Sequence, residues 1–265
     1  MKVWLNGGLC DSGDARIGVG DRGFTLGDGL FETLAARAGV AQHLDRHLQR
    51  LGRGCAVLRL PPPPEALPCA VAAVLAANTL QEAAIRITYT RGAGARGLPI
   101  PESCTPTLLV TAHPLPPAGE PAHCIVASVT RRNEYSPLSR IKSTNYLDNI
   151  LAREEARQRG AGEALLLNTA GKVAEASAAN IFIVKDGEVV TPPASDGALE
   201  GIMREEVIAR TDAIERGIGV ADVLAADEVF LSNSLGLRPV VAINGSPVGA
   251  GGQCAVFREL SAWLV

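Results

Sequence analysis

Residues 164–191, ALLLNTAGKVAEASAANIFIVKDGEVVT, decide how the second half of this chain folds. The stretch contains three apolar segments, at 164–167, 179–184 and 188–191, and a glycine turn follows each of the first two. Short apolar runs bounded by turn residues are typical of β-strands joined in a meander. We therefore expect three consecutive strands here, with one acid, Glu175, among small residues just before the second of them.

The flanking sequence predicts further strands and helices on both sides of this meander. Before it we expect strands at 3–9, 30–37, 85–90, 107–112 and 125–130, and helices at 44–58, 65–77 and 145–159. After it we expect a helix at 201–213 and strands at 228–231 and 239–243. The stretch at 114–121 is rich in proline and glycine and is the best candidate linker. These patterns predict an α+β chain of two domains, at residues 1–117 and 118–265.

Composition and charge exclude several classes of protein. The 265 residues carry 25 basic and 28 acidic side chains, a net charge of −3, which excludes a strongly basic nucleic-acid binder. No apolar run reaches the ~18 residues that span a bilayer, and the first residues do not resemble a signal peptide. None of the six cysteines has CxxC spacing, so we expect free thiols in a cytoplasmic protein. We expect neither nucleic acid nor a membrane as a partner.

The motifs of several enzyme classes are missing from the sequence. The four histidines form neither HExxH nor HxxEH, so we expect no metal site. There is also no GxSxG nucleophile elbow and no Walker A motif. Gly18, Gly20 and Gly23 have the spacing of a dinucleotide-binding loop, but we expect no strand before them and no helix after them. We interpret this segment as an ordinary loop.

Lysine is scarce, and this makes a search for lysine chemistry short. Of the 25 basic residues only Lys2, Lys142, Lys172 and Lys185 are lysines. Lys2 lies at the terminus, and Lys172 and Lys185 lie in expected hairpin turns. Lys142 stands among apolar neighbours before an expected helix, where a lowered pKa would let its amine form an imine with a carbonyl. An ordinary lysine at a helix entry explains the same pattern when it is taken alone.

Other residues supply what a pyridine cofactor with a phosphate requires. A buried Glu175 needs a cationic partner, which a pyridinium nitrogen would provide. Gly201 opens an expected helix, whose free N–H groups suit a phosphate. Arg50 could add a charged clamp and the segment 232–234 hydroxyl donors. Lysine, acid and phosphate cradle together indicate pyridoxal phosphate.

With these residues in place, the sequence resembles the class IV, fold type IV pyridoxal-phosphate enzymes over nearly its whole length. That family includes branched-chain aminotransferases, D-amino acid aminotransferases and aminodeoxychorismate lyases. The matching segments follow one another in order: 21–23 (DRG), 27–33 (GDGLFET), 47–51 (HLQRL), 141–146 (IKSTNY), 175–180 (EASAAN), 201–204 (GIMR) and 233–240 (NS…RPV). The resemblance implies a smaller N-terminal α/β domain, a larger C-terminal domain with a β-barrel-like core, and the cofactor pyridoxal 5'-phosphate between them.

The resemblance also implies a role for individual residues. Lys142 forms the aldimine with the cofactor and moves the proton, while Glu175 pairs with the pyridine nitrogen. The residues implied to hold the rest of the cofactor are Arg50, Ile202, Met203 and Ser234 at the phosphate, Tyr146 at the phenolic oxygen, and Asn180 in support of Glu175. The residues implied to contact substrate are Phe31, Thr33, Arg96 and Leu98. Arg131, Arg132 and Arg238 join Arg96 as candidates for binding a substrate carboxylate.

The subtype remains open at this point. The loop at 91–97, RGAGARG, resembles that of aminodeoxychorismate lyases, whereas 141–156 and the Glu175 segment look closer to D-amino acid aminotransferases. Leu98 departs from both, because the lyases usually carry Tyr there and the D-amino acid enzymes His. Three functions follow: an aminotransferase acting on a D-amino acid or branched-chain amino acid and a 2-oxo acid, an aminodeoxychorismate lyase releasing pyruvate and p-aminobenzoate, or a non-catalytic pyridoxal-phosphate-binding protein. The family further implies a homodimer.

Overall fold

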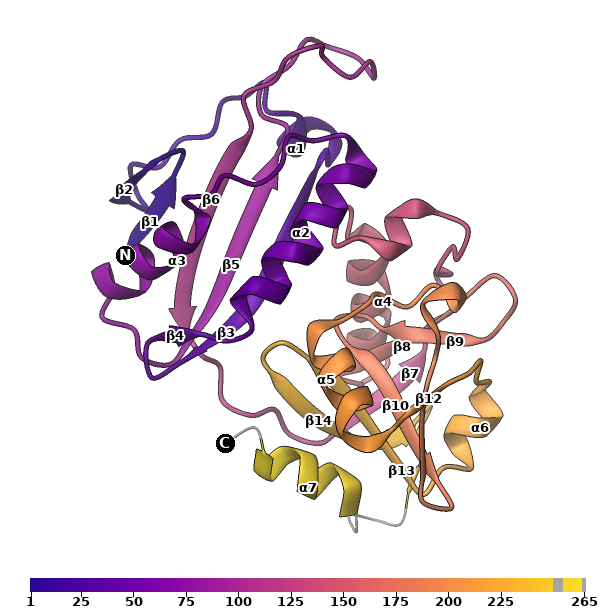
Figure 1. Ribbon diagram of the computed structural model, residues 1–265. Helices are drawn as coiled ribbons and strands as arrows, with labels where there is room; N and C mark the ends of the chain where they lie inside the picture. The colour runs from indigo at the N-terminus through magenta and orange to yellow at the C-terminus, as the bar shows by residue number, and fades with distance from the viewer. Residues whose placement is uncertain (250–254, 264–265) are drawn as a thin grey trace. The chain divides into compact units, whose positions relative to one another are not determined.

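The computed structural model describes residues 1–249 and 255–263 of the chain (Figure 1). The chain divides into two compact units, each with its own sheet and core. Unit 1 contains residues Met1–Pro116 and Ile141–Asn145, and unit 2 contains Pro117–Arg140 and Tyr146–Val265. The main boundary lies one residue before the one we expected from the sequence, but the short segment around Lys142 belongs to unit 1.

Unit 1 is built on a six-stranded antiparallel sheet in the order β2-β1-β6-β5-β3-β4. The strands are β1 (Lys2–Leu5), β2 (Gly8–Asp11), β3 (Gly29–Arg37), β4 (Val40–Ala41), β5 (Ala83–Thr90) and β6 (Thr107–Pro114). The central strands β3, β5 and β6 pair over eight residues each. The stretch at 3–9, where we expected a strand, contains a tight turn at Asn6-Gly7, both with positive φ, which divides it between β1 and β2.

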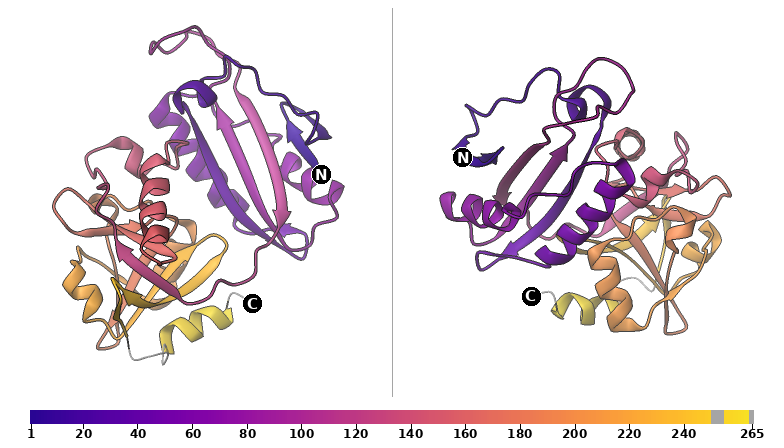
Figure 2. Two further views of the ribbon diagram at one scale, coloured as in Figure 1. Left: turned by 180° about the vertical axis from the view of Figure 1, so that it is seen from behind. Right: turned by 45° about the horizontal axis from the view of Figure 1, so that its top comes forward.

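Two helices, α2 (Leu44–Leu58) and α3 (Leu67–Ala77), lie against the same face of this sheet (Figure 2). Alternation along β3 sends Leu30, Leu34 and Ala36 to the helix side, where they join the buried core. Phe31 and Thr33 therefore point to the opposite face. One face of β3 thus packs in the hydrophobic core, and the opposite face holds the candidate substrate residues Phe31 and Thr33.

The segment Ile141–Asn145 pairs with the first half of β3. Phe31 N–H donates to the Lys142 carbonyl at 2.9 Å, and Thr144 N–H donates to the Gly29 carbonyl at 3.0 Å. β5 occupies one edge of β3, and β4 covers only the far end of the other edge. The segment fills the part of this edge that β4 leaves open. Its residues join unit 1 for that reason.

Unit 2 contains a nine-stranded mixed sheet in the order β12-β11-β10-β13-β14-β7-β8-β9, with β15 paired to β14. The strands are β7 (Ala122–Val126), β8 (Glu163–Leu167), β9 (Val173–Ala176), β10 (Asn180–Lys185), β11 (Glu188–Thr191), β12 (Ile214–Glu215), β13 (Glu228–Asn233), β14 (Gly236–Ile243) and β15 (Ser246–Pro247). The sheet curls, because a tight turn brings its last strand, β9, back to β10. This curled sheet confirms the barrel-like core that the family resemblance implied.

Helices cover the sheet of unit 2 and cap its smaller hydrophobic clusters. They are α4 (Leu147–Gln158), α5 (Ile202–Thr211), α6 (Val220–Leu224) and α7 (Ala255–Trp263), with two 3-10 turns at Pro137–Arg140 and Ala194–Asp196. Ala152 and Ala156 of α4 pack on β7 and β8, and Val207 of α5 packs on the stacked pair Phe182 and Phe230. Small alanines let α4 approach its strands closely.

Three expectations about elements were wrong. The meander at 164–191 has four strands instead of three, because β9 forms within it and includes Glu175. The strand expected at 125–130 is β7 at Ala122–Val126, since Ala122 is buried and Val129 is 54% exposed. The loop at 18–23 does run into a helix, α1 (Arg22–Leu26), which Asp21 caps by accepting from Gly23 N–H at 2.7 Å. This single turn is too short to show a periodic apolar pattern.

Candidate functional site

Lys142 lies over an aromatic ring in unit 1. Its Nζ is 4.5 Å from the centroid of the Phe31 ring, and the guanidinium carbon of Arg86 is 3.9 Å from the same centroid. Phe31 is itself 6% exposed. Backbone pairing with β3 fixes the position of Lys142, so its amine is placed by the sheet rather than by a free loop.

The other three lysines each form an ion pair with an aspartate. Lys2 Nζ is 2.8 Å from Asp11, and Lys185 Nζ is 3.0 Å from Asp227. Lys172 Nζ lies 3.5 Å from Asp196. All three sit at the surface with side chains 44–51% exposed. These positions are typical of solvated structural lysines.

Arg50 on α2 is held by a buried carboxylate of β3. Arg50 Nε and Nη2 donate to the two oxygens of Glu32 at 2.9 and 2.5 Å, and His47 Nδ1 lies 2.7 Å from Glu32 Oε2. The three side chains are at most 6% exposed. His47 and Arg50 lie on one face of α2 because residues three apart are neighbours on a helix.

Burial and pairing act in opposite directions on the Glu32 carboxyl. Burial alone would raise its pKa, but the hydrogen bonds from Arg50 and His47 outweigh burial, so the pKa of Glu32 lies below its usual range. Burial lowers the pKa of His47 despite its contact with Glu32. Arg50 and Glu32 therefore form an ion pair with a neutral histidine beside it.

The other candidate substrate residues of unit 1 occupy two different settings. Thr33 is half-buried on β3, on the same face as Phe31 and opposite Arg86 of β5. Arg96 and Leu98 lie in the loop between β5 and β6, and Leu98 is 81% exposed. Within unit 1 the structure brings Phe31 and Lys142 together, and it places Arg96 and Leu98 on the loop between β5 and β6.

In unit 2 a cluster of residues surrounds the start of α5. Glu175 Oε2 accepts from Leu199 N–H at 2.9 Å, and Glu175 Oε1 lies 3.1 Å from Arg132 Nε. Asn180 Nδ2 donates to the Leu199 carbonyl at 2.8 Å. One loop residue, Leu199, is thus fixed from both sides by Glu175 and Asn180.

The start of α5 has the features of an anion cradle. Gly201 caps the helix without a side chain, and a Cβ there would lie 2.1 Å from Asn180 Oδ1. Among the residues that the structure describes, no acceptor is found for the N–H groups of Ile202 and Met203, the first two of α5. Helix N-termini with free N–H groups attract phosphates.

Two serines lie on β13 or just after it. Ser232 pairs in register with Asn180, and Ser234 follows in the turn between β13 and β14. The Ser232 Oγ is buried, and in the described part of the chain it has no hydrogen-bond partner. An orphaned hydroxyl beside a helix N-terminus is consistent with a polar ligand at this place.

Tyr146 and the arginines expected to bind carboxylates are found in varied places. Tyr146 is half-buried at the residue that precedes α4. Arg131 Nη1 donates to the Ala127 and Thr130 carbonyls, and Arg238 Nε donates to the Glu120 carbonyl at 2.6 Å. Arg132 forms an ion pair with Glu175. Neither a metal-binding group of His, Cys, Asp and Glu nor a helix long and apolar enough to cross a membrane occurs in residues 1–249 and 255–263.

Comparison with known proteins decides the family of this chain. The sequence profile of the family described as amino-transferase class IV matches residues 29–243. The chain belongs to the class IV aminotransferase family. Class IV aminotransferases depend on pyridoxal 5'-phosphate, as the resemblance implied, and a branched-chain aminotransferase of the same fold has been solved with pyridoxamine 5'-phosphate.

Individual relatives carry different names. A Methanocaldococcus jannaschii protein named provisionally as a branched-chain-amino-acid aminotransferase is 37% identical over 92% of this chain and 88% of its own length. A D-alanine aminotransferase of Staphylococcus haemolyticus is 31% identical over 98% of this chain and 95% of its own length.

Solved structures share the fold over almost the whole chain. The branched-chain amino acid aminotransferase of Escherichia coli matches with a TM-score of 0.91 and 27% identity over 99% of this chain and 92% of that one. A Legionella pneumophila protein named provisionally as a 4-amino-4-deoxychorismate lyase matches with a TM-score of 0.88 and 27% identity over 96% of each chain. The fold type IV expected from the sequence is confirmed.

The residues present fit the cofactor. Unit 2 offers a helix start at Gly201–Met203 without a side-chain cap, a buried carboxylate, Glu175, and the Ser232 hydroxyl, which has no partner among the described residues. Unit 1 offers a lysine placed by backbone pairing and a buried arginine, Arg50. Each unit therefore offers groups of the kinds that the cofactor requires.

Sequence reasoning missed the residues that bind Arg50 and Glu175, directly or through Glu32. Glu32 and His47 lie within the quoted motifs but received no role, and Arg132 was considered only for substrate. The spacing of His47 and Arg50 on one helix face was the available signal for a shared partner. Nothing in the sequence indicates that Arg132 reaches Glu175, because the two lie 43 positions apart.

Proposed function

We propose that this protein is an aminotransferase that moves an amino group between an amino acid, of D-amino acid or branched-chain type, and a 2-oxo acid. The observation that carries the proposal is the setting of Lys142: it is held on β3 over Phe31, while the other three lysines are surface partners of aspartates. Pyridoxal phosphate, when bound, supplies an electron sink for negative charge at the substrate's α-carbon.

We assign the following roles to the chain's own residues. Lys142 would hold the cofactor through its Nζ, and its amine would take up and return the proton at the substrate's α-carbon. Glu175 holds a proton at the pyridine nitrogen, and Asn180 supports it by fixing Leu199. The cofactor's phosphate is assigned to Arg50, Ser234 and the N–H groups of Ile202 and Met203, and its phenolic oxygen to Tyr146. Substrate contacts are assigned to Phe31, Thr33, Arg96 and Leu98.

A second candidate function is the elimination of pyruvate from aminodeoxychorismate. The similarity to the provisionally named lyase and the loop at 91–97 favour it. A non-catalytic pyridoxal-phosphate-binding protein is the third, and the presence of both Lys142 and Glu175 argues against it. We also propose that the protein is a homodimer, by analogy with its family. We propose that it works in the cytoplasm, because the cysteines described are free thiols.

The visible spectrum of the purified holoenzyme separates these functions. The protein is mixed in turn with D-alanine, L-leucine and aminodeoxychorismate, and the absorption of the cofactor and the products are followed. We expect D-alanine or L-leucine to convert the cofactor to its pyridoxamine form with release of the matching 2-oxo acid. Pyruvate release from aminodeoxychorismate without that conversion would establish the lyase instead. No spectral change with any of the three amines would contradict both enzymatic functions.

A further inference from the structure

The loop between β5 and β6 carries two of the assigned substrate residues, Arg96 and Leu98. It runs through residues 91–106, and most of its side chains between 93 and 103 are exposed. An exposed loop without regular structure has to be held by other elements if its residues are to keep a fixed orientation. The structure shows what holds it.

Arg22, the middle residue of the DRG motif, binds two backbone carbonyls of this loop. Its Nη1 donates to the Gly97 carbonyl at 2.9 Å and its Nη2 to the Leu98 carbonyl at 3.3 Å. Its Nε donates to Asp28 Oδ2 at 2.9 Å. Arg22 is only 4% exposed, so these bonds form away from bulk water. One planar guanidinium therefore joins a carboxylate to two consecutive backbone carbonyls.

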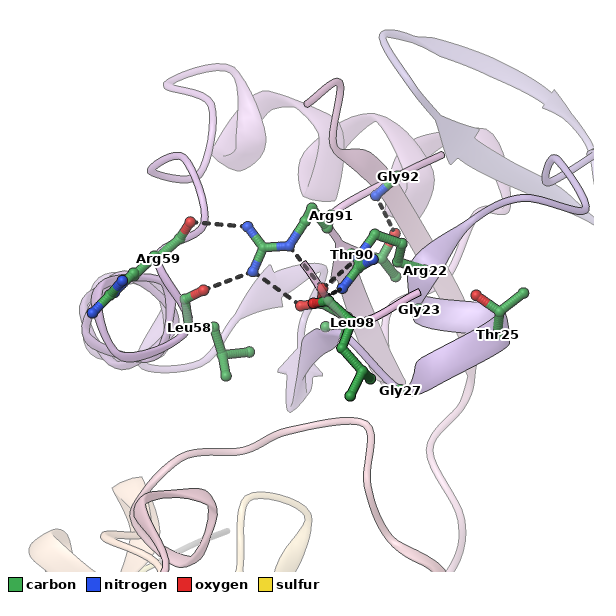
Figure 3. A network of polar contacts seen from close by, with 12 residues as sticks. Arg22, Gly23, Thr25, Gly27, Leu58, Arg59, Thr90, Arg91, Gly92 and Leu98 are labelled. Atoms are coloured by element: carbon green, nitrogen blue, oxygen red, sulfur yellow. Dashed lines mark hydrogen bonds and ion pairs between the residues drawn. The ribbon is translucent and has the colours of Figure 1, made fainter. Parts of the chain in front are cut away.

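Asp28 connects this contact to the end of α2 through a second arginine. Arg91 Nε and Nη2 donate to the two Asp28 oxygens at 2.7 and 3.0 Å. The same guanidinium donates to the carbonyls of Leu58 and Arg59 at 2.6 and 2.9 Å (Figure 3). Hydrogen bonds from both arginines outweigh burial and hold the pKa of Asp28 below its usual range. The carboxylate thus stays charged between two cations.

Backbone hydrogen bonds hold the first residues of the loop, 91–94. Arg22 N–H donates to the Gly92 carbonyl at 2.8 Å, and Gly94 N–H donates to the Gly20 carbonyl at 3.2 Å. Gly92 has a φ of +78°, and a Cβ there would lie 1.8 Å from the Thr105 carbonyl oxygen. The backbone fixes residues 91–94, and Arg22 provides the contacts to the outer part, at Gly97 and Leu98.

We propose that Arg22 is a positioning residue for substrate binding: it fixes the carbonyls of Gly97 and Leu98 and so sets the orientation of Leu98 and Arg96. The inference deepens the proposed function, on which it rests for the claim that the loop contacts substrate. Arg22 itself is assigned no contact with cofactor or substrate. Its loss should therefore affect substrate recognition and leave cofactor binding unchanged.

Two variants of Arg22 and one control test the proposal in the holoenzyme. Arg22→Lys keeps the positive charge beside Asp28, but one nitrogen cannot reach a carboxylate and two carbonyls together. Arg22→Met removes all three bonds and keeps the length of the stem. The control is Arg16→Met, because Arg16 Nη1 also donates to two backbone carbonyls, of Gly13 and Ala15, in another exposed loop of unit 1.

Limited proteolysis, steady-state kinetics and cofactor affinity are measured on all three variants. In both Arg22 variants we expect tryptic cleavage of the native protein after Arg96 to become faster by about tenfold or more, as local opening of the loop becomes easier. KM for the amino donor should rise by roughly tenfold while kcat stays within about twofold. This is the signature of a binding interaction that is lost equally from the ground state and the transition state. The dissociation constant of pyridoxal phosphate should stay at the wild-type value. Arg16→Met should leave all these quantities unchanged.

Two results would overturn the inference. An unchanged rate of cleavage after Arg96 in Arg22→Lys and Arg22→Met would show that Arg22 does not hold the loop. Faster cleavage with an unchanged KM would show that the loop it holds does not bind substrate. A wild-type enzyme that turns over none of the tested amines would instead defeat the proposed function, and the proteolysis data would still decide the anchoring role.

Discussion

At the scale of single residues, buried arginines in this protein are paired with acids. Arg22 and Arg91 share Asp28, Arg50 binds Glu32, and Arg204 lies 2.6 Å from Glu215. An unpaired buried charge would cost several kcal/mol, so each pair is a condition for burying its arginine. Arginines that are buried in this way therefore serve the fold.

The Glu32–Arg50 pair makes stability depend on pH in a definite direction. The pKa of Glu32 in the folded protein lies below its ordinary value of 4.5. The folded state therefore binds the proton less readily than the unfolded state, and the pair stabilises the fold at pH values above the unfolded pKa. This contribution is lost as the pH falls through the folded pKa.

For Glu32→Gln we predict that the free energy of unfolding of the cofactor-free protein falls by about 1–3 kcal/mol at pH 7, since a buried arginine loses its counter-charge. The loss should shrink as the pH is lowered below the ordinary pKa of glutamate. Urea unfolding at pH 7 and at pH 4 measures both effects. Arg50 should also bind the cofactor's phosphate less well, which lowers cofactor affinity.

The matched control for this prediction is Glu82→Gln. Glu82 forms a similar ion pair, 2.9 Å from Arg37, but both side chains are 40% exposed or more. Exposed pairs contribute ~0–1 kcal/mol, so this variant should unfold close to the wild type at both pH values. Equal losses in the two variants would show that burial of Glu32 has no special effect.

At the scale of elements, the start of α5 is the phosphate site that we propose. Gly201, Asn180 and Leu199 are packed so closely that the position of the helix N-terminus depends on the absence of a Cβ at residue 201. Asn180 is 6% exposed and its amide is already bound, so it has little room to move. The cradle is thus sensitive to a single methyl group.

We predict that Gly201→Ala weakens the binding of pyridoxal phosphate by about tenfold or more, because Asn180 and the helix N-terminus must move apart. Equilibrium titration of the cofactor-free protein, followed by absorbance, measures the dissociation constant. The control is Gly52→Ala in the middle of α2, where a Cβ meets nothing within 4 Å. That variant should gain ~0.5–1 kcal/mol in stability and keep the wild-type cofactor affinity. A wild-type affinity in Gly201→Ala would exclude this helix start as the phosphate site.

Helices and strands with a long apolar pattern, or with turn residues at both ends, could be predicted from the sequence. Elements that are held by contacts with distant residues could not. The helix expected at 44–58 is α2 to the residue, because its apolar side chains recur at helical spacing and face one sheet. The strand expected at 188–191 is also found unchanged as β11. The apolar pattern predicted none of α1, α6 and β9, because each is five residues or fewer and is held by neighbouring elements.

At the scale of the whole molecule, each unit has its own core, and the main division falls at the proline-rich stretch that the sequence singled out. The segment Ile141–Asn145 could not be assigned from sequence, because its pairing with β3 joins residues more than 100 positions apart. The same holds for the partners of the candidate site. Motifs indicated Lys142, Glu175 and Arg50, whereas distant contacts decide what holds each of them.

The central claim is that Lys142 is the lysine that carries the cofactor, and the scarcity of lysine makes it testable in one measurement. The holoenzyme is reduced with sodium borohydride, which fixes the cofactor to its amine, and then digested and mapped by mass spectrometry. We predict a phosphopyridoxyl group on Lys142 and none on Lys2, Lys172 or Lys185. A label on any of those three lysines, or a holoenzyme that acquires no label on Lys142, would contradict the claim.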